Sequence, residues 1–205
     1  WKVTPTQDFI YDQRMLDERV MQVMGTLGRH RFVPPRQQSQ AYANRPLPIG
    51  HGQTISQPFT VARMTEMVLE TSPRKVLEVG TGSGYQAAVL AECVDRVFTI
   101  EILPELGRLA AELLEELGYE NIVTRIGDGY DGWPDEAPFD AIVVTVAPEN
   151  IELDRLIAVN MEAVPLTVAG GERAIVNLLT GDCNGDLARD AGDLSALILE
   201  IFDTD

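Results

Sequence analysis

Three alternating glycines stand where a predicted strand gives way to a predicted helix. The stretch VLEVGTGSGYQ carries Gly80, Gly82 and Gly84 directly after an apolar strand over 75–79. Glycine lets a backbone approach a ligand closely, and the start of the following helix offers unpaired N–H groups. The spacing is G-x-G-x-G, which differs from the G-x-G-x-x-G of pyrophosphate-binding loops. The glycines alone indicate a ligand only weakly, because a tight turn would also explain them.

Acidic residues at the ends of the next two predicted strands strengthen the ligand interpretation. Glu101 ends the strand after the glycines, where its carboxylate could accept both hydroxyl groups of a ribose. Asp128 and Gly129 end the third strand, where they could reach an adenine. The loop holds no lysine and does not match a phosphate-binding P-loop, so a nucleoside without phosphates fits better than ATP or NAD. S-adenosylmethionine is such a nucleoside.

The elements that must position these residues alternate regularly along the chain. Apolar periodicity, proline and glycine signals predict helices over 15–27, 59–69, 85–93 and 104–117, and strands over 75–79, 96–100, 122–126 and 141–145. Strands that alternate with helices predict an α/β fold with a doubly wound, mostly parallel sheet. A further helix over 151–164 and a strand over 172–179 are expected. The long proline-rich loop over 29–58 is of the kind that often carries function.

Composition limits the number of domains and the classes of partner. A chain of 205 residues can form one domain with a small appendage. Its formal net charge of −16 at pH 7 argues against a nucleic-acid partner, because phosphate binding requires basic patches. No apolar run approaches the ~20 residues of a membrane-spanning helix, so we expect no membrane partner.

Four stretches together carry a resemblance to a known family. They are EVGTGSGYQAAVLAE, VFTIE, GDGYDGWPDEAPFDAIVVT, and RHRFVP followed by RPLPIGHGQTISQP. From about residue 15 to 148 the chain resembles the protein-L-isoaspartate O-methyltransferase family. Many methyltransferases share the first three stretches, whereas PLPIGHGQTISQP is close to a signature of this one family. The resemblance implies a Rossmann-like class I methyltransferase that uses S-adenosylmethionine to methylate the α-carboxylate of isoaspartyl residues in damaged proteins or peptides.

The resemblance also implies roles for individual residues. Ser56 matches the family's active-site serine, placed to donate a hydrogen bond to the substrate carboxylate or to hold the loop over the methyl donor, although by itself it would suggest only a turn. His30 and His51 receive no catalytic role, because the carboxylate nucleophile is already ionised at neutral pH and needs no general base. Tyr85 and Trp133 could stack on a ligand or pack in the core. The expected cofactor residues are Gln53, Thr54, Glu78, Gly80, Gly82, Gly84, Glu101, Asp128 and Gly129.

The C-terminal stretch departs from this family, which normally ends with a fifth strand and a final antiparallel pair. Here the strand over 172–179 fits the fifth strand, but the usual final strand pair is lacking. In its place, DCNGDLARDAGD and a predicted helix over 194–202 resemble one repeat of a dockerin, a calcium-binding module of extracellular assemblies. Oxygen-bearing side chains fill positions one, three, five, nine and twelve of the loop. The predicted calcium ligands are Asp182, Asn184, Asp186, Asp190 and Asp193.

Two departures leave the calcium assignment open. Leu187 occupies position six, where glycine normally allows the turn, and dockerins pair two repeats whereas one is present. We therefore divide the chain into a truncated methyltransferase domain over 1–180 and a dockerin-like segment over 181–205. A cohesin-type partner is a weaker alternative. We expect a cytoplasmic location from the first resemblance, and the second leaves a secreted or periplasmic one open.

Two alternative functions also stay open. One is a catalytically silent fusion or fragment whose calcium loop serves binding. The other is a methyltransferase that acts on a different carboxylate substrate.

Overall fold

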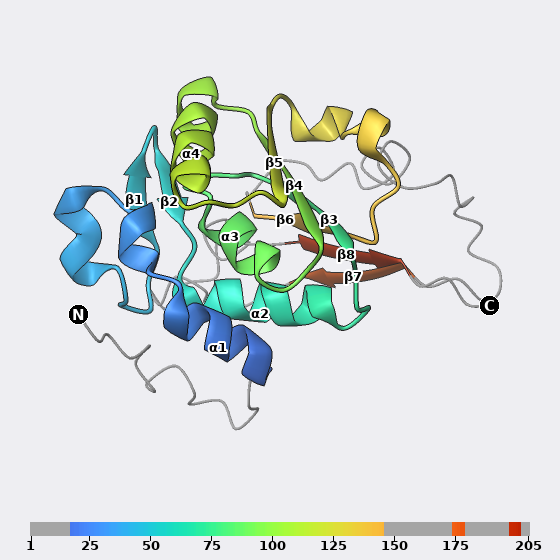
Figure 1. Ribbon diagram of the computed structural model, residues 1–205, viewed down its shortest axis with the longest axis horizontal. Helices are drawn as coiled ribbons and strands as arrows, with labels where there is room; N and C mark the ends of the chain where they lie inside the picture. Colours follow the sequence, from blue (N-terminus) through green and yellow to red (C-terminus); the bar gives the residue numbers. More distant parts are fainter. Residues whose placement is uncertain (1–16, 146–173, 179–196, 202–205) are drawn as a thin grey trace.

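A six-stranded sheet forms the centre of the structure, a computed structural model that describes residues 17–145, 174–178 and 197–201 (Figure 1). The strands are β3 (Lys75–Val79), β4 (Arg96–Glu101), β5 (Ile122–Ile126), β6 (Ala141–Val144), β7 (Ala174–Leu178) and β8 (Leu197–Ile201). Their order is β5-β4-β3-β6-β8-β7, and the first four pair in parallel. The chain winds outward from β3 to β5 and returns to the other side of β3 with β6. This topology confirms the predicted α/β Rossmann-like class, and it opens a crevice at the carboxyl ends of β3 and β6.

At the far edge of the sheet, one predicted strand is confirmed and one predicted helix is in fact a strand. β7 confirms the strand predicted over 172–179. The helix predicted over 194–202 is wrong, because Leu197–Ile201 forms β8, which pairs antiparallel with β6 and β7. A short apolar run such as LILEI suits a helix or a strand equally, and the open edge of β6 favours the strand, since it supplies hydrogen-bond partners. β8 thereby covers the edge that a missing final strand pair would expose.

Local sequence signals explain where the helices begin and end. The α-helices are α1 (Glu18–Thr26), α2 (Pro58–Leu69), α3 (Tyr85–Ala91) and α4 (Pro104–Glu116). Asp17 caps α1, because its carboxylate accepts hydrogen bonds from the N–H groups of Arg19 and Val20 at 2.9 and 3.2 Å. α2 and α4 each start with proline, which has no N–H to leave unpaired. The helices predicted over 15–27, 59–69, 85–93 and 104–117 are confirmed, with shifts only at their ends. The helix predicted over 151–164 lies outside the described residues. No helix in the described ranges is long and apolar enough to cross a bilayer.

The long loop predicted over 29–58 is built from short elements. It contains the 3₁₀ helices η2 (Arg29–Phe32) and η3 (Pro35–Gln40), followed by a hairpin of β1 (Leu47–Gly50) and β2 (Gln53–Ile55). His51 at the hairpin turn has a φ of 53° and is flanked by glycines. A Cβ placed on Gly82 would lie 3.5 Å from Ile49 Cδ1. The hairpin therefore packs directly against the glycine loop.

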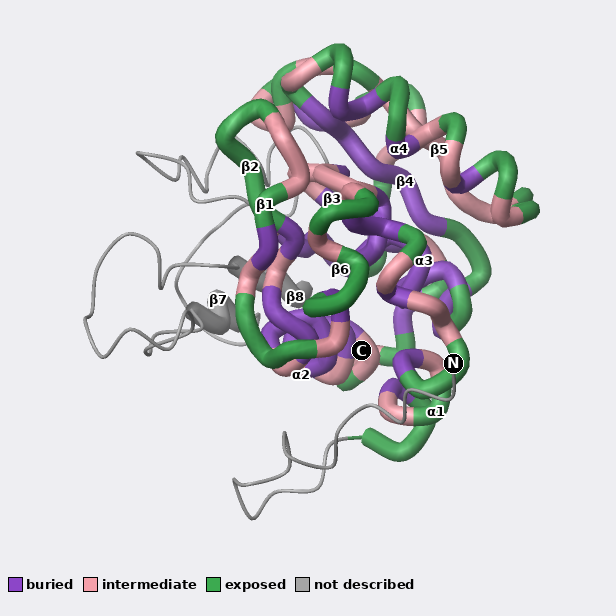
Figure 2. The backbone as a smooth tube through the Cα atoms, turned by 90° about the vertical axis from the view of Figure 1, so that its left-hand side faces the viewer, coloured by how far each residue is buried: buried purple, intermediate pink, exposed green. Residues whose placement is uncertain are grey.

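The sheet separates two apolar clusters that hold the strands rigid. Val76 and Leu77 are neighbours on β3 and both are fully buried, yet they belong to different clusters because successive strand side chains face opposite sides. All four α-helices contribute to the first cluster. In the second, Trp133 and Phe139 each pack against Phe98 with ring centroids 5.4 Å apart. Figure 2 shows β4 buried along nearly its whole length.

Candidate active site

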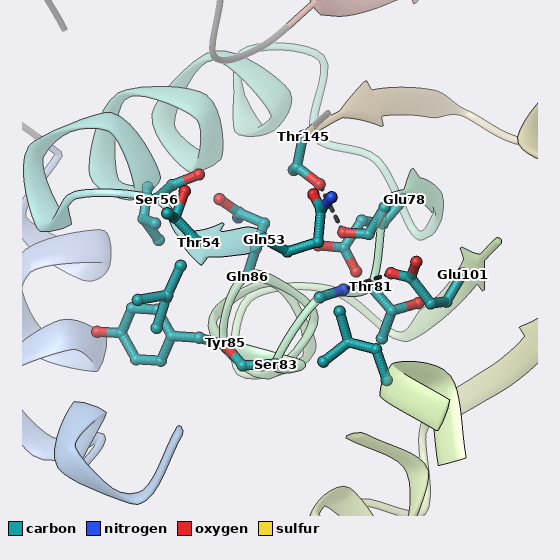
Figure 3. Close-up of a pocket in the computed structure, with 15 residues that line it drawn as sticks. Gln53, Thr54, Ser56, Glu78, Thr81, Ser83, Tyr85, Gln86, Glu101 and Thr145 are labelled. Atoms are coloured by element: carbon teal, nitrogen blue, oxygen red, sulfur yellow. Dashed lines mark hydrogen bonds between the residues drawn. The ribbon is translucent and has the colours of Figure 1, made fainter. Parts of the chain in front are cut away.

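A single pocket at the carboxyl ends of β3, β4 and β6 gathers most of the predicted site residues (Figure 3). Seven of them line it: Gln53, Thr54, Ser56, Glu78, Gly80, Gly82 and Glu101. The remaining lining residues are Ile55, Val61, Thr81, Ser83, Tyr85, Gln86, Leu106 and Thr145. The pocket thus joins the β1–β2 hairpin, the glycine loop and the starts of three helices, which are far apart in the sequence.

The glycine loop has a backbone shape that favours glycine. Gly80 and Gly82 have φ values of 103° and 55°, a region that other residues rarely adopt. The N–H of Gly80 donates to the carbonyl of Ile100 at 2.8 Å, which ties the start of the loop to β4. Both glycines line the pocket, so their backbone can approach a ligand without an intervening side chain.

Glu101 fastens the loop from the end of β4. Its Oε2 accepts a hydrogen bond from the N–H of Gly82 at 2.8 Å, and its Oε1 accepts one from the N–H of Leu103 at 3.0 Å. The side chain is buried but lines the pocket. A carboxylate has about four lone-pair sites, so two hydrogen bonds leave capacity for hydroxyl groups of a ligand.

Glu78 is a fully buried carboxyl group beside Glu101. Its Oε2 accepts a hydrogen bond from Thr99 Oγ1 at 2.5 Å, and the Thr99 hydroxyl is also 2.7 Å from Thr81 Oγ1. The pKa of Glu78 is raised to about 8, mainly by burial; the Thr99 hydrogen bond lowers it and the neighbouring Glu101 raises it. Within the described residues its Oε1 has no hydrogen-bond partner. A buried oxygen without a partner can accept a hydrogen bond from a ligand, and a cationic donor group suits it best.

Ser56 lies at the opposite end of the pocket from the two glutamates. Figure 3 shows Ser56, Thr54 and Tyr85 on one side, and Glu78 and Glu101 on the other. The serine follows the hairpin, whose strands pair Leu47 with Ile55 and Pro48 with Thr54. The PLPIGHGQTIS stretch therefore forms a structural arm that carries the serine to the pocket.

Thr145 and Gln86 are among the lining residues that the sequence analysis missed. Thr145 Oγ1 donates to the carbonyl of Gly80 at 2.6 Å, so it locks the end of β6 to the glycine loop. Gln86 Nε2 donates to Thr65 Oγ1 at 2.9 Å, while its Oε1 has no partner among the described residues. The position of Thr145 at a strand end, like that of Glu101, was a signal that could have identified it. Gln86 could have been noticed as a polar residue within an apolar helix.

Three predicted cofactor residues lie outside the pocket lining. Gly84 caps α3, and a Cβ placed on it would lie 3.2 Å from Leu114 Cγ. Asp128 Oδ1 accepts a hydrogen bond from the N–H of Tyr130 at 2.9 Å and caps the short helix η4 (Gly129–Asp131). These contacts give Gly84 and Asp128 structural roles, and the contact described in the next paragraph gives one to Gly129. The cofactor role of all three residues stays a prediction.

We expect Gly129→Ala to destabilise the fold. A Cβ at this position would lie 2.3 Å from Val79 Cγ1, and the stiff, β-branched valine can move away only by disturbing the sheet. Overpacking of this kind costs about 1–3 kcal/mol, measurable as a lower midpoint in urea. Gly127→Ala is the matched control, because its nearest neighbour would be Arg125 Nε at 3.6 Å, an ordinary contact. Equal midpoints for both variants would contradict the prediction.

The histidines and the two aromatic residues named in the sequence analysis have definite placements, whereas the predicted calcium ligands fall outside the described part of the chain. His30 Nδ1 forms a 2.6 Å hydrogen bond with the hydroxyl of Tyr42, and His51 Nδ1 lies 3.7 Å from Glu105 Oε2. Neither lines the pocket. Tyr85 does line it, whereas Trp133 belongs to the second apolar cluster. The predicted calcium ligands, Asp182, Asn184, Asp186, Asp190 and Asp193, lie outside the described residues. Among the described residues, no group of three or more acidic, histidine or cysteine side chains is arranged to hold a metal ion.

The fold and the glycine loop define a class before any comparison is made. A parallel sheet with a glycine turn after its central strand and a buried acid at the end of the next strand is a Rossmann-like methyltransferase fold. The family model "Protein-L-isoaspartate(D-aspartate) O-methyltransferase (PCMT)" matches residues 7–157. This chain belongs to that family.

Known proteins similar to this chain carry the same family name. A Polaromonas protein-L-isoaspartate O-methyltransferase 2 is 60% identical over 136 residues, which cover 66% of this chain and 64% of that protein. A Halorhodospira halophila protein-L-isoaspartate O-methyltransferase is 49% identical over 179 residues, 85% of this chain and 81% of that protein. A solved Plasmodium falciparum structure, titled a putative protein-L-isoaspartate O-methyltransferase in complex with S-adenosyl-L-homocysteine, has a TM-score of 0.63 at 18% identity and covers 91% of this chain and 87% of that one. The chain thus spans just under two thirds of the Polaromonas relative.

Proposed function

We propose that this chain transfers a methyl group from S-adenosylmethionine to the α-carboxylate of L-isoaspartyl residues in damaged proteins or peptides. The observation that carries the proposal is the shared pocket, in which Ser56 at the end of the family-specific hairpin faces the glycine loop. The names of the relatives support the same activity.

The pocket residues fit S-adenosylmethionine. Glu101 has free lone pairs for the ribose hydroxyls, and the unpartnered Oε1 of Glu78 can accept from the ammonium group. Gly80 and Gly82 expose backbone to the ligand. Two carboxyl groups at one end also suit a cationic methyl donor. The solved relative with S-adenosyl-L-homocysteine has the same fold.

The reaction requires the protein to align the acceptor carboxylate with the methyl donor, and it requires no proton transfer. S-adenosylmethionine supplies an activated methyl group on a sulfonium. A bond forms between a carboxylate oxygen and the methyl carbon, the carbon–sulfur bond breaks, and its electron pair stays on sulfur, so no proton moves. Ser56 can donate a hydrogen bond to the carboxylate and orient it, while Val61 and Leu106 line the pocket with apolar surface that limits water.

We expect Ser56→Ala to lower kcat/KM for an isoaspartyl peptide by about 10- to 100-fold, because a misoriented carboxylate loses the in-line geometry. Binding of S-adenosylmethionine should change less than about threefold, since the serine lies at the other end of the pocket. Methylation kinetics and calorimetry on the same preparation measure both effects. Ser39→Ala is the control, because Ser39 is exposed on η3. Unchanged kcat/KM in Ser56→Ala would remove the serine from the site.

The substrate itself is tested by competition. Isoaspartyl and normal aspartyl forms of one peptide, together with small carboxylic acids, are offered with S-adenosylmethionine. Preference for the isoaspartyl form supports the proposal, and equal use of a small acid favours the alternative of another carboxylate substrate. Methylation that survives Ser56→Ala combined with Gly82→Val would reject the site.

The calcium loop and the cellular location stay predictions. Calcium binding by residues 182–193, with a cohesin-type partner as its consequence, is tested by calorimetry on the whole chain and on Asp182→Ala with Asp193→Ala. If calorimetry detects no heat of calcium binding, the alternative of a catalytically silent protein whose calcium loop serves binding is rejected. The expected cytoplasmic location follows from the family and is tested by fractionation.

A further inference from the structure

Arg29 is the largest fully buried side chain among the described residues, and it carries a charge. Its exposed fraction is 1%. Its Nε donates to the carbonyl of Ala41 at 2.8 Å, and its Nη2 donates to the carbonyl of Ser56 at 2.6 Å. The guanidinium carbon lies 4.8 Å from the centre of the Tyr85 ring. Its Nη1 has no hydrogen-bond partner in the described part of the chain. This cation is therefore held by carbonyl groups and an aromatic face.

No described carboxylate forms a salt bridge with Arg29. The ion pairs of the described residues involve other cations. The pKa of Arg29 is lowered to about 10, because burial outweighs the opposing effects of Tyr85 and Tyr42, so the guanidinium keeps its charge at neutral pH. A buried cation without a counter-ion is costly, and natural proteins normally pair or hydrogen-bond such groups fully. An anion delivered by a ligand would relieve that cost.

The position of Arg29 gives the pocket two electrically different ends. Ser56 and Tyr85, both in contact with Arg29, line one end, while Glu78 and Glu101 line the other (Figure 3). The negative end suits a cationic methyl donor. The end backed by Arg29 suits an anionic acceptor, although the whole chain has a formal net charge of −16 that opposes any approaching anion. A charge surrounded by protein acts with less screening than charges on the surface.

We propose that Arg29 is a positioning residue that selects the ionised carboxylate of the acceptor and draws it to the Ser56 end of the pocket. Arg29 acts through its hydrogen bond to the Ser56 carbonyl and through its field, because it does not itself line the pocket. This role rests on the proposed function. It adds a charge requirement for the acceptor, and it gives a reason for a core arginine that forms no salt bridge with any described carboxylate.

The test compares two ligands that differ only in charge. A short peptide with one isoaspartyl residue and its carboxamide counterpart, an isoasparaginyl peptide, are titrated into the full chain in the presence of S-adenosylhomocysteine, which cannot donate a methyl group. The ratio of their two dissociation constants is measured within one preparation, so partly unfolded protein cancels. The wild-type chain should prefer the carboxylate by about 10-fold or more. Arg29→Gln should bring the ratio close to 1, and Arg29→Lys should restore part of it.

A matched control variant and a second measurement distinguish a positioning role of Arg29 from a purely structural role. Arg31→Gln removes a nearby exposed arginine, paired with Glu116 at 3.3 Å, and should leave the ratio unchanged. In Arg29→Gln, KM for the isoaspartyl peptide should rise about 10-fold, while kcat and the affinity for S-adenosylhomocysteine change less than about threefold. The wild-type preference should also persist between about 0.05 and 0.5 M salt, because a buried charge is screened little.

Different outcomes reject different statements. A preserved carboxylate preference in Arg29→Gln, or a wild-type preference that disappears in high salt, would overturn the role of Arg29 and leave the proposed function intact. A wild-type chain that binds neither peptide, although it binds S-adenosylhomocysteine, would overturn the isoaspartyl substrate and with it the role of Arg29.

Discussion

Glu101→Ala is expected to weaken the binding of S-adenosylmethionine by about 100-fold or more, the largest effect on binding at this site. Glu101 does two things at once. It holds the glycine loop through the N–H of Gly82 at 2.8 Å, accepts a second hydrogen bond at 3.0 Å from the N–H of Leu103 before α4, and offers its remaining lone pairs to the ligand. Hydrogen bonds to a charged group contribute about 1.5–3 kcal/mol each, so losing one to the ligand and loosening the loop together account for the factor.

Calorimetry with S-adenosylmethionine measures this effect directly. Glu112→Ala on the exposed face of α4 is the control, because it removes the same charge from the whole chain without touching the loop. Glu101→Gln separates the two roles, since the amide keeps one acceptor oxygen but turns a donor toward a backbone N–H. Affinity of Glu101→Ala within about threefold of the wild type would show that the ribose lies elsewhere.

Glu78→Gln is expected to stabilise the ligand-free protein at alkaline pH while weakening its affinity for S-adenosylmethionine. Burial raises the pKa of Glu78 from 4.5 to about 8, and Glu101 adds to the increase. Between these two values the folded protein retains a proton that the unfolded chain has released. The stability associated with the protonated group is therefore complete below pH 4.5 and is lost as the pH rises to about 8. Glutamine does not titrate, so the variant avoids this loss, which amounts to a few kcal/mol.

Urea unfolding without ligand at pH 5, 7 and 9 measures this effect. The difference in free energy of unfolding between Glu78→Gln and the wild type should grow up to about pH 8 and then level off. Glu112→Gln is the matched control on the protein surface, and it should follow the wild-type pH dependence. Parallel curves for Glu78→Gln and the wild type would mean that Glu78 is already ionised in the ligand-free pocket. The loss of ligand affinity expected for Glu78→Gln arises because glutamine cannot ionise, whereas the ammonium group of the ligand favours the ionised form of Glu78.

The strands and the glycine loop could be predicted because their signals are local. The β-branched runs of β3, β4, β5 and β6 each lie between turn residues, and each strand was found at nearly its true bounds. β8 was mistaken for a helix, because LILEI gains its strand partners from β6, more than 50 residues earlier in the chain. Glu101 was identified because it ends a strand in the pattern of a known ligand crevice.

The site residues that escaped prediction depend on contacts across long stretches of chain. Thr145 becomes a site residue by bonding Gly80, 65 positions away. Gln86 is a site residue because Thr65 on another helix holds its amide nitrogen, while its buried side-chain oxygen has no partner among the described residues. Conversely, Gly129 matched the position of a ligand residue in sequence, yet its closest constraint is the packing of Val79.

The family, the parallel sheet and the expected chemistry of the glycine loop can be read from the chain alone, since they depend on residue types at short spacings. The placement of Ser56 in the same pocket as that loop depends on long-range folding, because the β1–β2 hairpin must fold back over Gly82 to bring the serine there. Tertiary packing also buries Arg29 against the carbonyl of a residue 27 positions away, with no counter-ion among the residues that the structure describes. Burial and the pairing of charges are properties of packed surfaces, and the local sequence around an arginine does not specify them.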